Sequence, residues 1–264
     1  MIDSHAHLDF PDFDEDRQQV ILRAQRAGVT TIINVGADLE SSRKSVKLAE
    51  QHQFIYASVG VHPHDAKALD ETALAEIEQM SRHPRVVAIG EIGLDYHWDL
   101  SPRDVQRDAF ERQLALAEGR DLPIIVHDRD AHADVMSILS EHAGTDGALR
   151  GVLHCFSGDV AMADQAIELG MHIAVGGPVT FRNPRHLPDV VRQIPLSRLL
   201  LETDCPYLAP QPHRGTRNEP AYVLLVAQKV AELKRISVVE VQETTSRNVR
   251  ELFGLETKET VGRE

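Results

Sequence analysis

The chain has 264 residues, and 28 lysines and arginines against 41 aspartates and glutamates give it a formal net charge of −13. This excess of negative charge excludes a general electrostatic attraction to nucleic acid or anionic lipid, so any polyanion must be bound locally. The two cysteines, Cys155 and Cys205, have no CxxC spacing, and no signal-peptide pattern precedes His5. No segment approaches the ~18 apolar residues of a membrane span. These features predict a cytoplasmic protein that does not enter a membrane.

Short apolar runs alternate with longer amphipathic segments along the chain, with a period of about thirty residues. Eight runs have the character of strands, at 2–8, 30–36, 55–62, 86–94, 123–129, 151–157, 172–176 and 199–204. Helical spacing of apolar residues predicts helices at 15–27, 41–51, 71–81, 103–118, 131–141, 160–169 and 222–234. A last pair of helices, at 237–244 and 247–252, is expected to pack outside the sheet.

Eight strand–helix units in a chain of this length predict an α/β fold, a closed (β/α)8 TIM barrel, with one domain over 1–254. An open dinucleotide-binding sheet is disfavoured because no GxGxxG follows the first strand. Residues 255–264 are charged and poor in apolar side chains, so they are expected to form a flexible tail. In such barrels the functional groups stand at the carboxyl ends of the strands.

Two histidines, His5 and His7, alternate within the first strand. Residues two apart in a strand point to the same face, so the two imidazoles should aim at one point. In a helix they would lie on nearly opposite faces. The spacing therefore predicts a chelating pair.

Further candidate ligands occur at or near the ends of later strands. A single histidine in an apolar strand is more often a core residue with one satisfied hydrogen bond, but the whole set combines four imidazoles with two carboxylates. Glu91 stands in a glycine-flanked apolar run, where a buried carboxylate needs a positive partner, either a metal ion or Arg129. The complete set of candidate metal ligands is His5, His7, Glu91, His127, His154 and Asp204.

These ligands exceed the needs of one tetrahedral ion, so two divalent metal ions are expected. One ion would take His5, His7, Glu91 and Asp204, and the other would share Glu91 with His127 and His154. Glu91 would then bridge and Asp204 would accept a proton from water, which makes both candidate catalytic residues for hydrolysis. Imidazole suits zinc, manganese or nickel, and the carboxylates would also accept magnesium.

Residues near this centre are candidates for substrate binding. His62 and His64 follow the third strand, Arg129 ends the fifth, and Arg214 and Arg217 follow the eighth. On an acidic protein, a local positive cluster is typical of phosphate contact, although any one arginine could be a solvated loop charge. Four aromatic residues near strand ends could stack unpaired bases or cap the core: Tyr96, Trp98, Phe156 and Tyr207.

Several motifs together resemble the TatD family of metal-dependent deoxyribonucleases, of the amidohydrolase superfamily. They are SHAHL at 4–8, GVHPH at 60–64, GEIGLDY at 90–96, HCFSG at 154–158, ETDCPYL at 202–208 and RNEP at 217–220. The family often has alanine or serine where this chain has Cys205. The resemblance implies a metal-bearing (β/α)8 barrel, the six ligand positions above, and a 3′-5′ exodeoxyribonuclease acting on single-stranded 3′ ends of DNA.

Two alternatives remain open from the sequence. The same metal-activated water could attack a carbonyl, as in an amidohydrolase or a deacylase of D-aminoacyl-tRNA, although the arginines favour phosphate. A non-catalytic, metal-bound scaffold is the other alternative, and the complete ligand set argues against it. The oligomeric state is not predicted.

Overall fold

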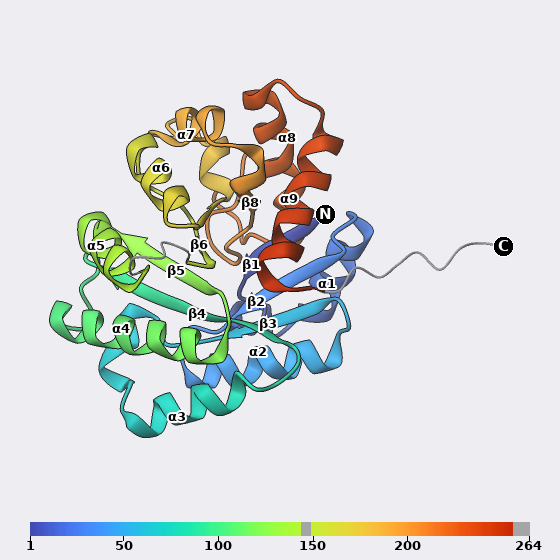
Figure 1. Ribbon diagram of the computed structural model, residues 1–264. Coiled ribbons are helices and arrows are strands. Elements are labelled where there is room, and N and C mark those ends of the chain that lie inside the picture. Colours follow the sequence, from blue (N-terminus) through green and yellow to red (C-terminus); the bar gives the residue numbers. More distant parts are fainter. Residues whose placement is uncertain (144–148, 256–264) are drawn as a thin grey trace.

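The computed structural model describes residues 1–143 and 149–255, in which eight parallel strands alternate with helices (Figure 1). The strands are β1 (Ile2–Ala6), β2 (Thr31–Val35), β3 (Ile55–Val59), β4 (Val86–Asp95), β5 (Ile124–Arg129), β6 (Gly151–Leu153), β7 (His172–Val175) and β8 (Leu199–Leu201). The helices are α1 (Arg17–Arg26), α2 (Leu39–Gln51), α3 (Glu71–Met80), α4 (Arg103–Arg120), α5 (His132–Ala143), α6 (Val160–Glu168), α7 (Leu187–Gln193), α8 (Val223–Lys234) and α9 (Val238–Phe253). Adjacent strands pair in the order of the chain, which confirms the predicted (β/α)8 barrel.

The barrel closes between its first and last strands. An isolated parallel bridge joins Ala6 to Cys205 just beyond β8. Nearby, the buried Asp3 carboxylate accepts hydrogen bonds from Thr203, from the backbone N at 2.9 Å and from the hydroxyl at 2.6 Å. A side chain therefore supplements the short backbone pairing along this seam.

One buried cluster takes side chains from seven of the eight strands and from the last helix. Side chains alternate along a strand, so Ile33 and Val35 of β2 face the barrel interior in this cluster, whereas Ile32 between them packs outward against helices. The interior cluster consists of Ile2, Ile33, Val35, Val87, Ala88, Ile125, Val152, Ala174, Leu200, Val249, Leu252, Phe253 and Leu255. The end of α9 therefore closes the barrel at the end where the strands begin.

This arrangement corrects the prediction for the last helices. The segment predicted as two helices, at 237–244 and 247–252, is the single helix α9, and its carboxyl end packs on the barrel interior. The apparent break is a run of hydroxyl residues, in which Thr245 Oγ1 donates to the Val241 carbonyl one turn earlier at 2.8 Å. The helix α7 was not predicted. Of the predicted tail at 255–264, Leu255 is buried and the remainder lies outside the described residues.

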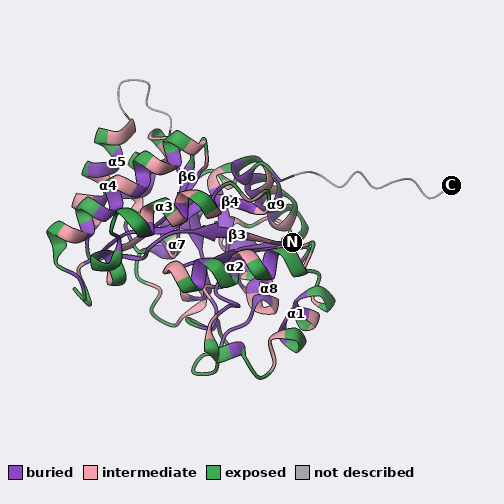
Figure 2. Ribbon diagram, turned by 90° about the horizontal axis from the view of Figure 1, so that it is seen from below, coloured by how far each residue is buried: buried purple, intermediate pink, exposed green. Residues whose placement is uncertain are grey.

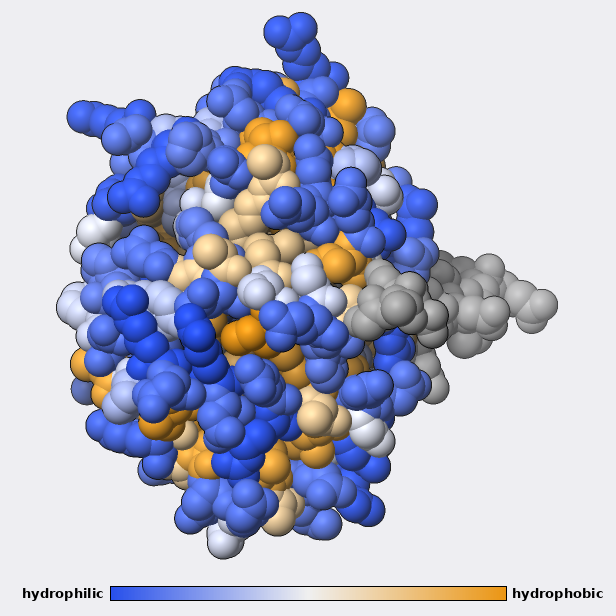
Figure 3. Space-filling view, turned by 60° about the vertical axis from the view of Figure 1, so that its left-hand side comes forward, coloured by the Kyte–Doolittle hydropathy of each residue, from blue (hydrophilic) through white to orange (hydrophobic). Residues whose placement is uncertain are grey.

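The helices cover the sheet, so the strands are buried while the outer helix faces are exposed (Figure 2). The face shown in Figure 3 is mostly hydrophilic, with apolar side chains gathered in patches among the charged ones. Within the described residues, no helix combines the length and apolar character required to cross a membrane.

Candidate active site

The six predicted ligands gather at the carboxyl ends of the strands. His5 lies in β1, Glu91 in β4 and His127 in β5, while His7, His154 and Asp204 follow β1, β6 and β8. His5 is fully buried, and Glu91, His7 and His154 are at most 4% exposed. Buried groups of this kind need partners, which are hydrogen bonds for the polar groups and opposite charges, from one another or from a bound ion, for the charged ones.

Gly93, two residues after Glu91, allows β4 and β5 to approach closely. Gly93 pairs with His127 across the two strands and has φ +135°. A Cβ atom at Gly93 would overlap the carbonyl oxygen of His127. Only glycine fits this contact, which brings the strand that carries Glu91 against the strand that carries His127.

His5, His7 and Asp204 form one group of facing side chains. His5 Nε2 lies 3.1 Å from His7 Nε2, as expected for alternate residues of a strand. Asp204 Oδ1 lies 3.5 Å from His7 Nε2 and 3.8 Å from His5 Nε2. Asp204 has φ +56°, a left-handed conformation that aspartate tolerates better than most residues, and its backbone N donates to the His5 carbonyl at 2.9 Å.

Glu91 joins this group to a second one. Its Oε2 lies 3.3 Å from His5 Nε2 and 3.5 Å from His7 Nε2. Its Oε1 lies 2.8 Å from both His127 Nδ1 and His154 Nε2. Oε1 also lies 3.5 Å from His62 Nε2, so this carboxylate faces five imidazoles, two through Oε2 and three through Oε1.

The electrostatics of the cluster require positive charge at its centre. Burial alone would raise the pKa of Glu91, but the imidazoles of His154 and His62 hold it well below its usual range. Burial opposes protonation of His7 and His127, yet the neighbouring carboxylates raise the pKa of each to about 9. In the protein alone, protons supply this charge, and a divalent cation would replace them.

The hydrogen bond of His7 sets which of its nitrogens could bind a cation. His7 Nδ1 lies 2.9 Å from the Val35 carbonyl, so the ring keeps its proton there when a cation displaces the other one, and Nε2 is then the free ligand atom. The Nε2 atoms of His5 and His154 face Glu91, while their buried Nδ1 atoms have no hydrogen-bond partner among the described residues. Three sets of side chains each bring their ligand atoms within 4.8 Å of one another: His5, Glu91 and His154; His5, His7 and Asp204; and His62, Glu91 and His127.

Asp95 is a member of the site that the sequence analysis did not assign. It is 1% exposed, and its Oδ2 lies 2.9 Å from His64 Nε2 and 3.2 Å from His127 Nε2. A carboxylate on the outer nitrogen of a histidine fixes the ring and its tautomer, which leaves His127 Nδ1 to face Glu91. The signal in the sequence was its position, at the end of the strand that carries Glu91.

Glu202 is a second carboxylate that was not assigned to the site. It is fully buried, and its Oε1 accepts the backbone N–H of Cys155 at 2.6 Å. Burial raises the pKa of Glu202 well above its usual range, so it is held as a neutral acid. Its Oε1 also lies 3.9 Å from His154 Nδ1, which places a buried acid behind that imidazole.

His62 and His64, predicted to bind substrate, both border the cluster. His62 Nε2 lies 3.5 Å from Glu91 Oε1, and His62 Nδ1 accepts the backbone N–H of His64 at 3.1 Å. Burial holds the pKa of His62 well below its usual value, so the ring is neutral and its proton is on Nε2. His62 therefore presents an N–H donor toward the centre.

The three predicted substrate arginines are arranged differently from one another. Arg129 ends β5 two residues after His127, and its guanidinium carbon lies 5.6 Å from the centroid of the Trp98 ring. Arg217 Nη2 instead lies 2.7 Å from Oδ2 of Asp16, the residue that immediately precedes α1 in the chain. Arg214 packs over Phe181, with its guanidinium carbon 3.7 Å from the ring centroid. Of the three, Arg129 shares a strand with a predicted ligand, whereas Phe181 and Asp16, the partners of Arg214 and Arg217, are residues outside the ligand set.

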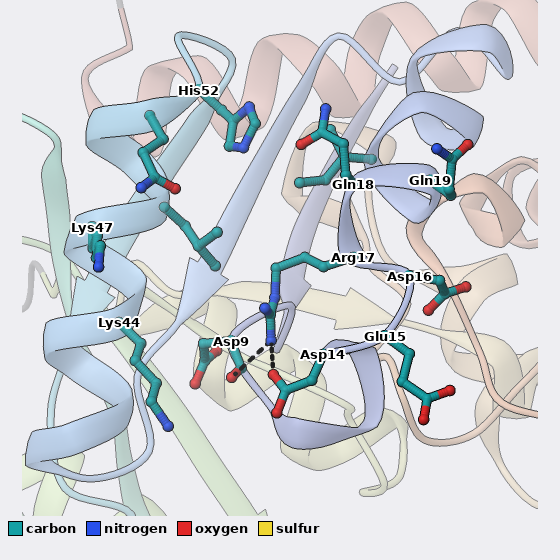
Figure 4. Close-up of a pocket in the computed structure, with 13 residues that line it drawn as sticks. Asp9, Asp14, Glu15, Asp16, Arg17, Gln18, Gln19, Lys44, Lys47 and His52 are labelled. Atoms are coloured by element: carbon teal, nitrogen blue, oxygen red, sulfur yellow. Dashed lines mark hydrogen bonds and ion pairs between the residues drawn. The ribbon is translucent and has the colours of Figure 1, made fainter.

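A groove of about 560 Å³ lies apart from these residues, between the start of α1 and α2 (Figure 4). Its lining residues fall within 9–21 and 44–52, so it contains none of the six predicted ligands. Two of its charged side chains have ion-pair partners, Arg17 with Asp14 and Lys44 with Glu40. The groove is thus separate from the candidate active site.

Comparison with known proteins places the chain among metal-dependent hydrolases. Residues 2–254 match the family described as "TatD related DNase". The chain is 46% identical over 253 residues to the uncharacterized metal-dependent hydrolase YabD of Bacillus subtilis, covering 96% of this chain and 98% of that protein. It is 35% identical to a protein named 3′-5′ ssDNA/RNA exonuclease TatD from Pectobacterium carotovorum, covering 97% of this chain and 100% of that protein.

A solved structure shows the same fold. The TatD homologue YjjV of Escherichia coli superimposes with a TM-score of 0.91 at 34% identity, over 97% of this chain and 98% of that one. The extent of both matches and the eight-stranded parallel barrel agree with one another. The chain belongs to the TatD family of metal-dependent hydrolases.

Proposed function

We propose that this hydrolase cleaves phosphodiester bonds of single-stranded DNA from the 3′ end, with two divalent cations at the histidine–carboxylate cluster. The observation that carries the proposal is the Glu91 carboxylate, which directs one oxygen to His5 and His7 and the other to His127 and His154. The related exonuclease named above supports DNA as the substrate. A set with four imidazoles favours zinc, manganese or nickel, while magnesium would rely on the carboxylates.

In this proposal His5, His7, Glu91 and Asp204 would hold one cation, and Glu91, His127 and His154 would hold the other. When bound, such cations supply Lewis acidity toward a phosphate oxygen and lower the pKa of water toward neutrality. Asp204 would accept the proton of the attacking water, since it is ionised: burial would raise the pKa of this carboxyl, but the His7 hydrogen bond lowers it. Its side chain is 13% exposed, which lets solvent reach it.

Two other side chains act on the substrate itself. His62 donates its Nε2–H to a phosphate oxygen, a role that its neutral tautomer allows over a wide range of pH. Arg129 lies on the rim, where its guanidinium balances the charge of the phosphate chain on an otherwise acidic protein.

The test is digestion of a 5′-labelled single-stranded oligodeoxynucleotide with magnesium, manganese or zinc. We expect a ladder of products shortened from the 3′ end, and no ladder with the double variant His127→Ala/His154→Ala. Equal digestion by the double variant would identify a contaminating nuclease. Hydrolysis of a D-aminoacyl-tRNA without digestion of DNA would assign the site to acyl transfer instead.

Replacing Asp95 by asparagine is expected to weaken cation binding by about 10- to 100-fold, the usual effect of losing such an outer partner. An amide nitrogen facing His127 would reverse the hydrogen bond and move the ring proton onto Nδ1, the atom directed at Glu91. The measurement is calorimetric titration of the protein with manganese. The matched control is Asp128→Asn, since Asp128 pairs with His132 at 2.7 Å outside the cluster. Wild-type affinity in Asp95→Asn protein would refute this role.

A further inference from the structure

Of the four aromatic side chains near the strand ends, the structure leaves two exposed. Phe156 is 4% exposed and belongs to the core, and Tyr96 donates its hydroxyl to Asp134 at 2.6 Å. Trp98 is 56% exposed and Tyr207 is 52% exposed. Tyr207 has Phe10 as an edge-on neighbour, with ring centroids 6.2 Å apart. Both exposed rings follow strands that lead to predicted ligands, and Trp98 has in addition the guanidinium of Arg129 beside it.

The Asp95 carboxylate links the backbone of Trp98 to His127 of the histidine cluster. Its backbone N donates to Asp95 Oδ1 at 2.9 Å, while the other oxygen of Asp95 contacts His127. Gln106 holds the same loop from the helix behind it, donating to the carbonyls of Asp95 at 3.2 Å and Ser101 at 2.8 Å. The loop that carries the ring is therefore fixed relative to the predicted ligands.

The guanidinium group of Arg129 lies beside the Trp98 ring. The guanidinium carbon of Arg129 lies 5.6 Å from the Trp98 centroid, within the range of a cation–π contact. Arg129 is itself exposed and follows His127 by two residues on β5. An aromatic plane and a guanidinium thus stand together at the edge of the site, one suited to the face of a base and the other to a phosphate.

We propose that Trp98 and Arg129 form a stacking subsite for an unpaired nucleobase next to the phosphodiester that is cleaved. This inference rests on the proposed function and specifies how the site recognises its substrate. Aromatic side chains stack on every base, so the subsite favours nucleic acid without selecting a sequence. In a duplex the base faces are already covered by neighbours, so the subsite selects single strands.

The kinetic test compares single strands that differ only in their two 3′-terminal nucleotides, which carry bases or are abasic. For the strand with bases, Trp98→Ala should lower kcat/KM by about 5- to 100-fold, the range typical of one lost base stack. Trp98→Phe should retain most activity. On the abasic strand, wild-type and Trp98→Ala proteins should be equal. Leu100→Ala, in the same loop and also 56% exposed, is the control for lost apolar surface and should match the wild type.

Fluorescence gives a readout that does not depend on turnover, because Trp98 is the only tryptophan of the chain. In full-length Asp204→Asn protein, its emission should be quenched by the strand with bases and not by the abasic strand or inorganic phosphate. The stacking subsite would be overturned if Trp98→Ala lowered kcat/KM equally on both strands. It would also be overturned if the strand with bases left the Trp98 emission unchanged. Absence of digestion by the wild type would instead refute the proposed function.

Discussion

Replacement of Glu91 by glutamine is expected to lower the rate of hydrolysis by about 10³-fold or more, because the proposed bridging ligand of both cations would lose its charge and one of its oxygens. Glutamine keeps the shape of the side chain but has one oxygen and no charge. It can face one pair of histidines with a lone pair and presents N–H groups to the other, so at most one cation retains its ligands. The measurement is kcat/KM on the single-stranded substrate.

The control for this variant is Glu76→Gln. Glu76 pairs with Arg43 at 2.6 Å on the outside of the barrel, so the same change there leaves the cluster untouched. Glu76→Gln should keep wild-type activity, and circular dichroism should show that both variants are folded. Activity of Glu91→Gln above a tenth of the wild-type rate would contradict the bridging role.

The largest effect on stability is expected from Phe253→Ala. Phe253 is 4% exposed and packs in the interior cluster where α9 closes the barrel. Loss of a buried phenylalanine removes its transfer free energy and leaves a cavity, which together lower the free energy of unfolding by about 3–5 kcal/mol. The measurement is urea unfolding followed by far-ultraviolet circular dichroism.

Val239 offers a control on the same helix, since it is 59% exposed. Val239→Ala should change the free energy of unfolding by at most about 0.5 kcal/mol. Without urea, Phe253→Ala protein should retain its specific activity, because the residue is at the opposite end of the barrel from the cluster. If Phe253→Ala lowered the free energy of unfolding by less than about 1 kcal/mol, α9 would not close the core.

The sequence predicted the barrel well because strand and helix periods are local properties. The spacing of His5 and His7 predicted facing imidazoles, and the structure brings their Nε2 atoms to 3.1 Å. The four later candidates could be grouped because the carboxyl ends of parallel strands meet at one face. Their binding of metal stays a prediction.

The remaining features depend on contacts between distant segments, which no local pattern encodes. The role of Asp95 comes from His64 and His127, 31 and 32 residues away. The pairing of Arg217 with Asp16, across more than 200 residues, turns a predicted phosphate ligand toward α1. The continuity of α9 is a local exception: Thr245 belongs to a run of hydroxyl residues that resembles a helix end, but its hydroxyl donates to the Val241 carbonyl four residues earlier and the helix continues.

The seam of the barrel couples the proposed cation to the completion of folding. His5 and His7 lie on one side of the seam and Asp204 on the other, and Asp3 meets Thr203 there across 200 residues of chain. Until β8 docks against β1, two of these ligands are present without the third. A cation with these ligands would thus select full-length, closed molecules over partly synthesised or partly open ones, and its occupancy would report that the two ends of the barrel had met.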